Sequence, residues 1–178
     1  RKTLRKIFKL KYRWGIAYQF TDNWKNITLW RSVKIPNPKN RFLADPFLIS
    51  YKNEHFCFVE DFSFLDNKGS ISVYKITKNG FKEIGTALVE DYHLSFPYLF
   101  EYENELYMCP ETSEKNEIRL YKCIDFPLEW KFHKTIMKNV FASDTLIFFK
   151  NNKWWLISSI NRSKIGDLSS QLYIYFNE

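Results

Sequence analysis

The sequence predicts an all-β protein. Hydrophobic residues make up 45% of the chain and aromatic residues 19%, and they fall in short alternating runs that suit strands with one buried face. The 178 residues include five glycines and six prolines, a composition that argues against disorder. A third observation is a hairpin pattern that occurs three times at nearly constant spacing.

The repeated pattern consists of a short apolar strand, a polar hinge and a second apolar strand. The three copies begin at Ala44-Asp45-Pro46, Ser95-Phe96-Pro97 and Ser143-Asp144-Thr145. Fifteen positions after the central residue of each opening stand Glu60, Glu111 and Ser159. The same hairpin pattern therefore occurs three times in the chain.

Residues 1–13 are a basic arm with seven basic residues and no acidic ones. The rest of the chain holds 20 basic and 20 acidic residues, so the net charge of +7 describes the arm and not the domain. Two interpretations of the arm are open: a solvated leader, or a peripheral contact with an anionic membrane face or another anion. The strands do not interleave aromatic with basic residues as an RNA-binding sheet does, so we expect no nucleic-acid partner.

Residues 14–40 are predicted to be short strands and a linker. Two β-like runs, 14–20 and 27–30, flank a polar turn at Asp22-Asn23. Pro36 and Pro38 each remove a backbone donor and end regular structure. The strand pair is a candidate strap for closing a ring of repeats.

Residues 41–178 are predicted to be a partial β-propeller, with blades at about 41–90, 91–139 and 140–178. We expect strands at 45–50, 55–60, 70–77 and 81–88, at 96–102, 105–110, 117–123 and 128–136, and at 144–149, 154–159 and 172–176. Repeats of about 50 residues that each form a four-stranded antiparallel meander are typical of propeller blades. Because a propeller needs about four blades to close, this chain should be a fragment, completed by the remainder of the propeller or by an oligomer.

Antiparallel geometry predicts that several acidic residues meet at one end of the propeller channel. The innermost strand of each blade lines the axis and the second strand returns beside it, so the start of one and the end of the other share a pole. Asp45 and Asp144 stand at first-strand starts, and Glu60 and Glu111 at second-strand ends. Other polar residues are expected close by: Asp61, His93 and Ser95.

Carboxylates gathered in this way suit glycosyl hydrolysis or transfer. One acts as base or nucleophile and another as a proton donor with a raised pKa. No cofactor is expected, although oxygen ligands would also suit a divalent cation. A structural interpretation competes, in which Asp-Pro is a turn device, the glutamates pair with basic side chains of neighbouring blades, and His93 is a packed loop residue.

The cysteines indicate a reducing compartment. Cys57, Cys109 and Cys123 lie inside apolar runs and form no CxxC pair, so we expect free thiols. No apolar run is long enough to cross a bilayer, and the first 20 residues lack the apolar core of a signal peptide. The predicted location is the cytoplasm.

An ordered series of motifs resembles a known family. It consists of Ala44-Asp45-Pro46-Phe47-Leu48, Phe58-Val59-Glu60-Asp61, His93-Leu94-Ser95-Phe96-Pro97-Tyr98, Met108-Cys109-Pro110-Glu111-Thr112, Ile118-Arg119-Leu120-Tyr121 and Trp154-Trp155-Leu156. Over about residues 40–176 the series resembles the N-terminal domain of glucosamine inositolphosphorylceramide transferase and its bacterial relatives. More distantly it is similar to the five-bladed propellers of the arabinanase, levansucrase and invertase superfamily, including glycoside hydrolase family 43.

The resemblance implies a five-bladed propeller, of which this chain holds about three blades, and roles for individual residues. Asp45 matches the aspartate that serves those furanosidases as base or nucleophile, and Asp144 resembles their accessory aspartate. Glu111 is a candidate proton donor by its position alone. Phe96 stands where a second Asp-Pro motif would place its carboxylate, and Thr145 replaces the proline after Asp144. In the transferase relatives the propeller accompanies a separate glycosyltransferase domain, in a context of polysaccharide biosynthesis.

We therefore expect a carbohydrate-active propeller that hydrolyses or transfers a glycosyl group. Its expected catalytic residues are Asp45, Glu111 and Asp144, and its expected substrate-binding residues are Glu60, Asp61, His93 and Ser95. The alternative is a non-catalytic module that binds a glycan or nucleotide sugar beside a glycosyltransferase domain.

Overall fold

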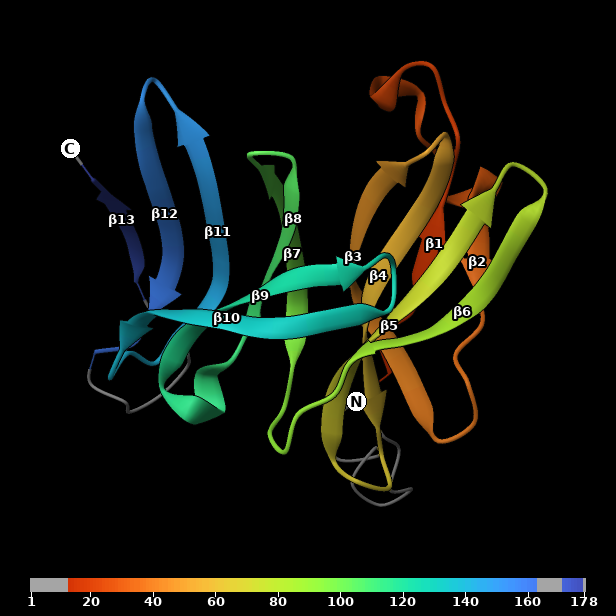
Figure 1. Cartoon of the computed structure of the whole chain (residues 1–178). Helices are drawn as coiled ribbons and strands as arrows, with labels where there is room; N and C mark the ends of the chain where they lie inside the picture. The colour runs from red at the N-terminus through yellow and green to blue at the C-terminus, as the bar shows by residue number, and fades with distance from the viewer. Residues whose placement is uncertain (1–12, 163–170, 178) are drawn as a thin grey trace.

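The chain folds into antiparallel sheets arranged like the blades of a propeller (Figure 1). The structure is a computed structural model that describes residues 13–162 and 171–177. Of the predicted basic arm it includes only Arg13, so the arm lies outside the described residues. The regular elements in the described ranges are strands and short 3₁₀ helices, which confirms the all-β prediction.

Each of the first two blades is a four-stranded antiparallel meander, as predicted. Blade one consists of β3 (Arg41–Tyr51), β4 (Glu54–Ser63), β5 (Lys68–Thr77) and β6 (Gly80–Leu88). Blade two consists of β7 (Ser95–Tyr102), β8 (Glu105–Glu111), β9 (Glu117–Asp125) and β10 (Glu129–Lys138). Blade three has three described strands, β11 (Ala142–Lys150), β12 (Lys153–Ile160) and β13 (Leu172–Phe176).

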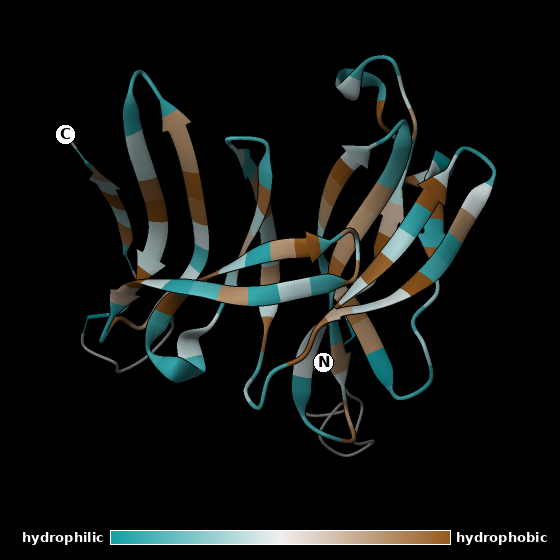
Figure 2. Cartoon of the chain, in the orientation of Figure 1, coloured by the Kyte–Doolittle hydropathy of each residue, from teal (hydrophilic) through white to brown (hydrophobic). Residues whose placement is uncertain are grey.

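Alternating side chains explain why these segments form strands. Along β5, Ile71 and Val73 are fully buried in the core between blades one and two, while Tyr74 and Ile76 pack on the other face of the same blade. Apolar bands therefore recur along the strands, and the hairpin ends are hydrophilic (Figure 2). The turn from β5 to β6 uses Gly80 at a φ of 152°, which an L side chain rarely adopts.

The innermost strands of the three blades lie next to one another. β7 contacts β3 on one side and β11 on the other (Figure 1). Because β4 and β8 return antiparallel beside β3 and β7, the start of each first strand lies beside the end of the second. This topology brings the predicted acidic positions to one end of the molecule.

The N-terminal strand pair packs on blade one. β1 (Ile16–Tyr18) pairs antiparallel with β2 (Val33–Ile35), and Ile16 and Ile35 share a buried cluster with Leu43 of β3. The Tyr18 hydroxyl also donates a hydrogen bond to the Thr77 carbonyl oxygen at 3.1 Å. The pair therefore covers the face of blade one that points away from blade two, and its role as a closing strap stays a prediction.

The predicted strand at 27–30 is wrong. That stretch contains the 3₁₀ helix η2 (Leu29–Arg31), which follows a second 3₁₀ helix, η1 (Trp24–Asn26). β1 instead pairs with 33–35, because this register buries Ile35 against blade one, whereas Leu29 and Trp30 are 85% and 77% exposed. Alternation between apolar and polar residues predicts a strand only where one face has something to cover.

The two junctions between blades differ in how they are filled. Between blades one and two, the Phe126 ring stacks on Tyr51 at 4.1 Å between centroids, and Trp130 packs edge-on against Phe58 at 5.7 Å. Trp130 is 7% exposed and belongs to the buried core between blades one and two. The corresponding space between blades two and three is a cavity of about 600 Å³.

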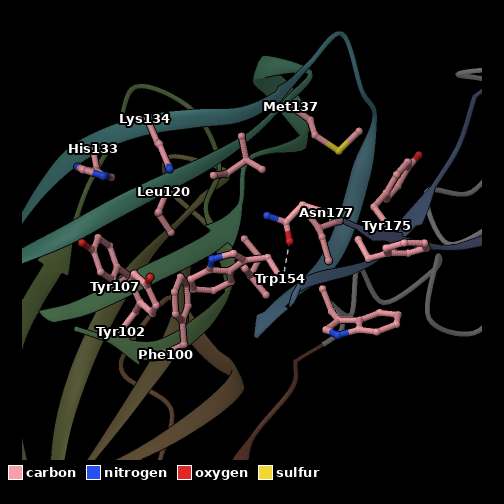
Figure 3. A pocket seen from close by; sticks show the side chains of 15 residues that line it. Phe100, Tyr102, Tyr107, Leu120, His133, Lys134, Met137, Trp154, Tyr175 and Asn177 are labelled. Carbon is pink, nitrogen blue, oxygen red and sulfur yellow. Dashed lines mark hydrogen bonds between the residues drawn. The ribbon is translucent and has the colours of Figure 1, made fainter. Parts of the chain in front are cut away.

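Aromatic side chains dominate the wall of this second junction (Figure 3). Tyr102 and Tyr107 occupy the positions that Tyr51 and Phe56 occupy in blade one, and Trp154 of β12 packs against Tyr102 at 4.7 Å. The backbone N–H of Trp154 donates a hydrogen bond to Asn177 Oδ1 at 2.7 Å.

Candidate functional site

Every blade carries a bulge at the same point of its first strand. The pairing with the second strand shifts between Ala44 and Phe47, between Ser95 and Tyr98, and between Ser143 and Leu146. The residues within these bulges, Asp45, Phe96 and Asp144, have φ angles of 47°, 47° and 54°. Positive φ is uncommon for residues other than glycine, and a bulge redirects the side chain it carries. Each blade thereby presents one side chain at the same end of the molecule.

The bulges also connect neighbouring blades through their backbone. The Phe96 N–H of blade two donates a hydrogen bond to Asp45 Oδ2 of blade one at 3.2 Å. The backbone of Asp144 in blade three likewise hydrogen-bonds the Glu111 carboxyl of blade two and lowers its pKa. The bulges of blades two and three thus each supply a donor to a carboxyl group of the preceding blade.

Glu60 is a buried carboxyl beside Asp45. It is 7% exposed and pairs with Ala44, the residue before Asp45. Burial, the charges of Asp45 and Glu111 and a hydrogen bond to Asp45 together raise the pKa of Glu60 to about 8. Glu60 is therefore mostly protonated at neutral pH.

Glu111 occupies the equivalent position in blade two. The pKa of Glu111 is raised to about 7, chiefly by burial, and the charges of Asp144 and Asp45 act in the same direction. The Ser113 hydroxyl opposes this by donating a hydrogen bond to Glu111 Oε1 at 2.9 Å. Burial and then the charge of Asp45 also raise the pKa of Asp144. Asp45, Glu60, Glu111 and Asp144 are close enough to influence one another, and we call them the carboxylate cluster.

His93 reaches this cluster from the loop before β7. Its Nδ1 accepts a hydrogen bond from the Gly69 N–H at 2.9 Å, so the neutral ring carries its proton on Nε2, which lies 3.6 Å from Glu60 Oε1. Burial lowers the pKa of His93, while the charges of Glu114 and Asp45 raise it in part. The ring is thus positioned as a hydrogen-bond donor toward Glu60.

Gly69 allows this approach of the histidine. A Cβ atom at Gly69 would lie 2.4 Å from the Leu94 carbonyl oxygen and 2.8 Å from His93 Cε1. No larger residue fits there without movement of the backbone. The loop is further held by Glu114, whose Oε2 accepts the His93 N–H at 3.0 Å.

Asp61 lies apart from the cluster. Successive strand residues point to opposite faces, so Asp61 points away from the side on which Glu60 lies. Its Oδ2 accepts from Arg41 Nη1 at 2.7 Å and from Ser72 Oγ at 2.9 Å, and the side chain is buried. Burial raises the pKa of Asp61, and Ser72 and Arg41 lower it in part. This geometry is that of a structural ion pair.

Ser95 is buried and pairs directly with Glu111 across β7 and β8.

The structural interpretation expects the two glutamates to pair with basic side chains. Within residues 13–162 and 171–177, neither Glu60 nor Glu111 lies within ion-pair distance of a lysine or arginine. None of the five titratable residues brought together here forms an ion pair with a lysine or arginine in this part of the chain. These five are Asp45, Glu60, Glu111, Asp144 and His93.

Sequence reasoning missed Ser113 and Glu114. Both belong to η3 (Ser113–Lys115), a single turn after β8 that ends at Asn116, whose φ is 54°. The signal was the polar sequence Thr112-Ser113-Glu114 directly after a strand that ends in a predicted site residue. Such a turn returns its side chains toward the strand end.

The part of the chain that the structure describes contains no metal-binding group and no activated thiol. No group of three or more His, Cys, Asp or Glu side chains there is arranged to hold a metal ion. Cys57, Cys109 and Cys123 are free, and burial raises the pKa of Cys57 and of Cys109 to about 12. These thiols are inert at neutral pH.

Among the described residues, no helix has the length and apolarity that crossing a bilayer requires.

Comparison with known proteins places the chain in a family. The family profile described as "Glucosamine inositolphosphorylceramide transferase 1, N-terminal" matches residues 25–178. The glucosamine inositolphosphorylceramide transferase 1 of Arabidopsis thaliana is 36% identical over 142 residues, which are 79% of this chain and 18% of that protein. The protein of the same name from Oryza sativa subsp. indica is 39% identical over 124 residues, 68% of this chain and 16% of that protein. The chain thus spans less than a fifth of these relatives.

Two solved structures share the fold at low sequence identity. A GH32 beta-fructofuranosidase of Bombyx mori has a TM-score of 0.64 and 13% identity, over 83% of this chain and 36% of that one. An alpha-L-arabinofuranosidase from Lactobacillus brevis has a TM-score of 0.57 and 12% identity, over 82% of this chain and 59% of that one. These similarities confirm the propeller prediction. Together with the sequence match, they show that the chain belongs to the family of the N-terminal domain of glucosamine inositolphosphorylceramide transferase 1 and is a carbohydrate-related domain.

Proposed function

We propose that this domain hydrolyses or transfers a glycosyl group at the carboxylate cluster. The observation that carries the proposal is the presence of two glutamic acids beside Asp45, Glu60 buried and Glu111 half-buried, with pKa values of about 8 and about 7. Glycosyl transfer needs a protonated acid and an ionised base or nucleophile in one site, and environments that separate the pKa values of neighbouring carboxyls provide both.

Each member of the cluster is assigned a role by its surroundings. Asp45, held by the Phe96 N–H, acts as base or nucleophile. Glu111, with a pKa of about 7, gives a proton to the leaving oxygen, and Asp144 adjusts the charge beside it. Glu60 stays protonated and orients Asp45 through their hydrogen bond, and His93 and Ser95 contact the sugar.

The names of the relatives support the proposed substrate class. Both are named glucosamine inositolphosphorylceramide transferase 1, and this chain covers only a small part of their length. We propose a glycan or nucleotide sugar as the ligand, and polysaccharide synthesis as the context. The cytoplasm is the proposed location because the three thiols are unpaired.

A second candidate function is sugar binding without catalysis, and Phe96 favours it. Blades one and three place Asp45 and Asp144 in their bulges, whereas blade two places a phenyl ring there. The Phe96 ring packs edge-on against Phe47 at 4.9 Å and is only partly buried. An aromatic ring at this end suits packing against the apolar face of a sugar.

The test is to incubate the protein with a panel of furanosides, pyranosides and nucleotide sugars and to follow products by NMR. We expect product from the native chain, and a loss of about 100-fold or more in turnover for Asp45→Asn. Asp125→Asn, which changes an exposed aspartate at the end of β9, is the matched control and should keep full activity. If ligand signals shift but neither the native chain nor any variant forms product, the domain binds sugar without catalysing a reaction.

A further inference from the structure

Four large apolar side chains are exposed on one short segment between β1 and β2. Residues 21–32, which we call the apolar loop, contain η1 and η2, and neither helix buries a residue. Trp24, Ile27, Leu29 and Trp30 are 75%, 51%, 85% and 77% exposed. Single exposed apolar residues are ordinary, but four within seven positions form a patch that marks an interaction surface.

The apolar loop keeps its shape without burying these side chains. Asn23 caps η1 by accepting the Lys25 N–H at 2.9 Å, and the side chain of Gln19 accepts the Thr28 N–H at 3.1 Å. Backbone bonds within each turn satisfy further donors, those of Asn26, Ile27, Arg31 and Ser32. A segment whose backbone groups are paired internally can enter an apolar medium at much lower cost than one whose groups are bonded to water.

Positive charge surrounds the exposed side chains. Residues 21–34 contain three basic residues, Lys25, Arg31 and Lys34, and one acidic residue, Asp22. Lys25 and Arg31 lie over the rings of Trp24 and Trp30, with Nζ and Cζ at 5.8 Å and 4.5 Å from the ring centroids. Tryptophan beside lysine or arginine suits the boundary between lipid headgroups and acyl chains, where the ring is apolar and its N–H is wet.

We propose that the apolar loop docks this domain on the surface of an anionic lipid membrane. Leu29 and Ile27 enter the outer acyl region, Trp24 and Trp30 lie at the headgroup level, and Lys25, Arg31 and Lys34 face the lipid phosphates. A lipid surface is the occupant that the charges favour, because residues 21–34 carry three basic side chains and one acidic side chain, a balance that complements lipid phosphates. Apolar insertion combined with basic residues is the pair of signals that a peripheral anchor requires.

Docking in this way would turn the carboxylate cluster away from the bilayer. The apolar loop lies at the same end of the molecule as the turn between β3 and β4 (Figure 1), and Phe20 at its base contacts His55 of β4 at 5.2 Å between ring centroids. Asp45 lies six residues down β3 from Tyr51, a distance of about 20 Å along the strand. The candidate site would therefore open toward the aqueous side.

The test measures binding to vesicles. We would sediment the protein with vesicles of pure phosphatidylcholine and with vesicles that contain about one third phosphatidylserine, and record tryptophan emission. We expect binding and a blue shift with the anionic vesicles only, and at least a tenfold weaker partition for the double variant Leu29→Ser, Trp30→Ser. The matched control is Leu65→Ser, since Leu65 is 79% exposed on the turn between β4 and β5, far from the apolar loop in sequence and outside the buried clusters.

Three outcomes would overturn the proposal. Anionic vesicle binding that the double variant leaves unchanged would assign the contact to the basic residues 1–13. Equal losses in the double variant and in Leu65→Ser would point to a general loss of solubility. If the native chain binds no vesicles and forms a dimer, and the double variant is a monomer, a second copy of the chain would be the partner of the apolar loop. Thermal unfolding of each variant, compared with the native chain, shows that the fold is kept.

Discussion

Glu60 and Glu111 occupy the same position in successive blades, yet their surroundings differ. Both end the second strand of a blade, and burial is the first cause of the raised pKa of each. Glu60 faces another carboxyl, Asp45, whereas Glu111 receives hydrogen bonds from the Ser113 hydroxyl and the Asp144 backbone. Burial raises the pKa of both carboxyls, and the Ser113 hydroxyl and the Asp144 backbone oppose this rise at Glu111, whose pKa is about 7. A proton donor works best with a pKa near the working pH, and this is why we propose Glu111 for that role.

The largest expected effect comes from exchanging each glutamate for glutamine. Glu111→Gln should lower glycosyl turnover by about 100-fold or more, because no proton reaches the leaving oxygen. Glu60→Gln should cost only about 10-fold, because the amide N–H still donates to Asp45. Initial rates from product NMR at pH 6 measure both. Equal losses of turnover in the two variants would contradict the proposal that Glu111 donates the proton while Glu60 only orients Asp45.

A smaller effect is expected from Ser113→Ala. Without the hydroxyl, the pKa of Glu111 should rise toward that of Glu60, since the bond at present favours the ionised form. The rate of an acid-catalysed step falls as pH rises through the pKa of the acid, so the alkaline limb should move to higher pH and the rate at pH 8 should rise a few-fold. Ser70→Ala on β5, which removes a hydroxyl from a strand residue paired with Asp61 and keeps the Ser113 and Asp144 bonds to Glu111, serves as the control. An unchanged pH profile would remove Ser113 from the tuning of Glu111.

The smallest expected effect is on stability. The pKa values of both glutamates in the folded chain exceed the ordinary value of 4.5, so the folded state holds protons that the unfolded state releases. The stabilisation is complete below about pH 4.5 and is lost as pH rises through about 7 and about 8. At pH 8 the Glu60→Gln variant should therefore melt several degrees higher than the native chain, since about 1 kcal/mol corresponds to about 2–4 °C in a domain of this size. Glu111→Gln should show a smaller gain, and at pH 5 both differences should shrink.

Sequence alone could predict the meanders and the end of the molecule at which the acidic residues meet. Alternation identified strands where a sheet face is buried, and the antiparallel return of the second strand placed Glu60 next to Asp45. The strand expected at 27–30 failed, because its apolar side chains have no surface to cover. The period of two along β4 places Asp61 on the opposite face of the sheet from Glu60.

Contacts made by loops could not be predicted. The bond from Ser113 to Glu111 depends on the turn after β8, and the bond from Gly69 to His93 joins two segments 24 residues apart. The positive φ angles of the bulges depend on how each first strand aligns with its neighbour, which composition does not encode. The resulting pKa differences follow from distances of a few ångströms and not from residue type.

The cavity between blades two and three has a consequence for local opening. The first junction is filled by Phe126 and Trp130, so separating blades one and two would expose a packed aromatic core. Blade three approaches blade two most closely through β11, and beyond that strand lies the cavity. Regions with fewer packed contacts open at a lower free energy than the whole domain. The amide hydrogens of β12 and β13 should thus exchange with solvent through a partial opening that leaves blades one and two intact, and the chain would behave as a rigid pair of blades with a hinged third.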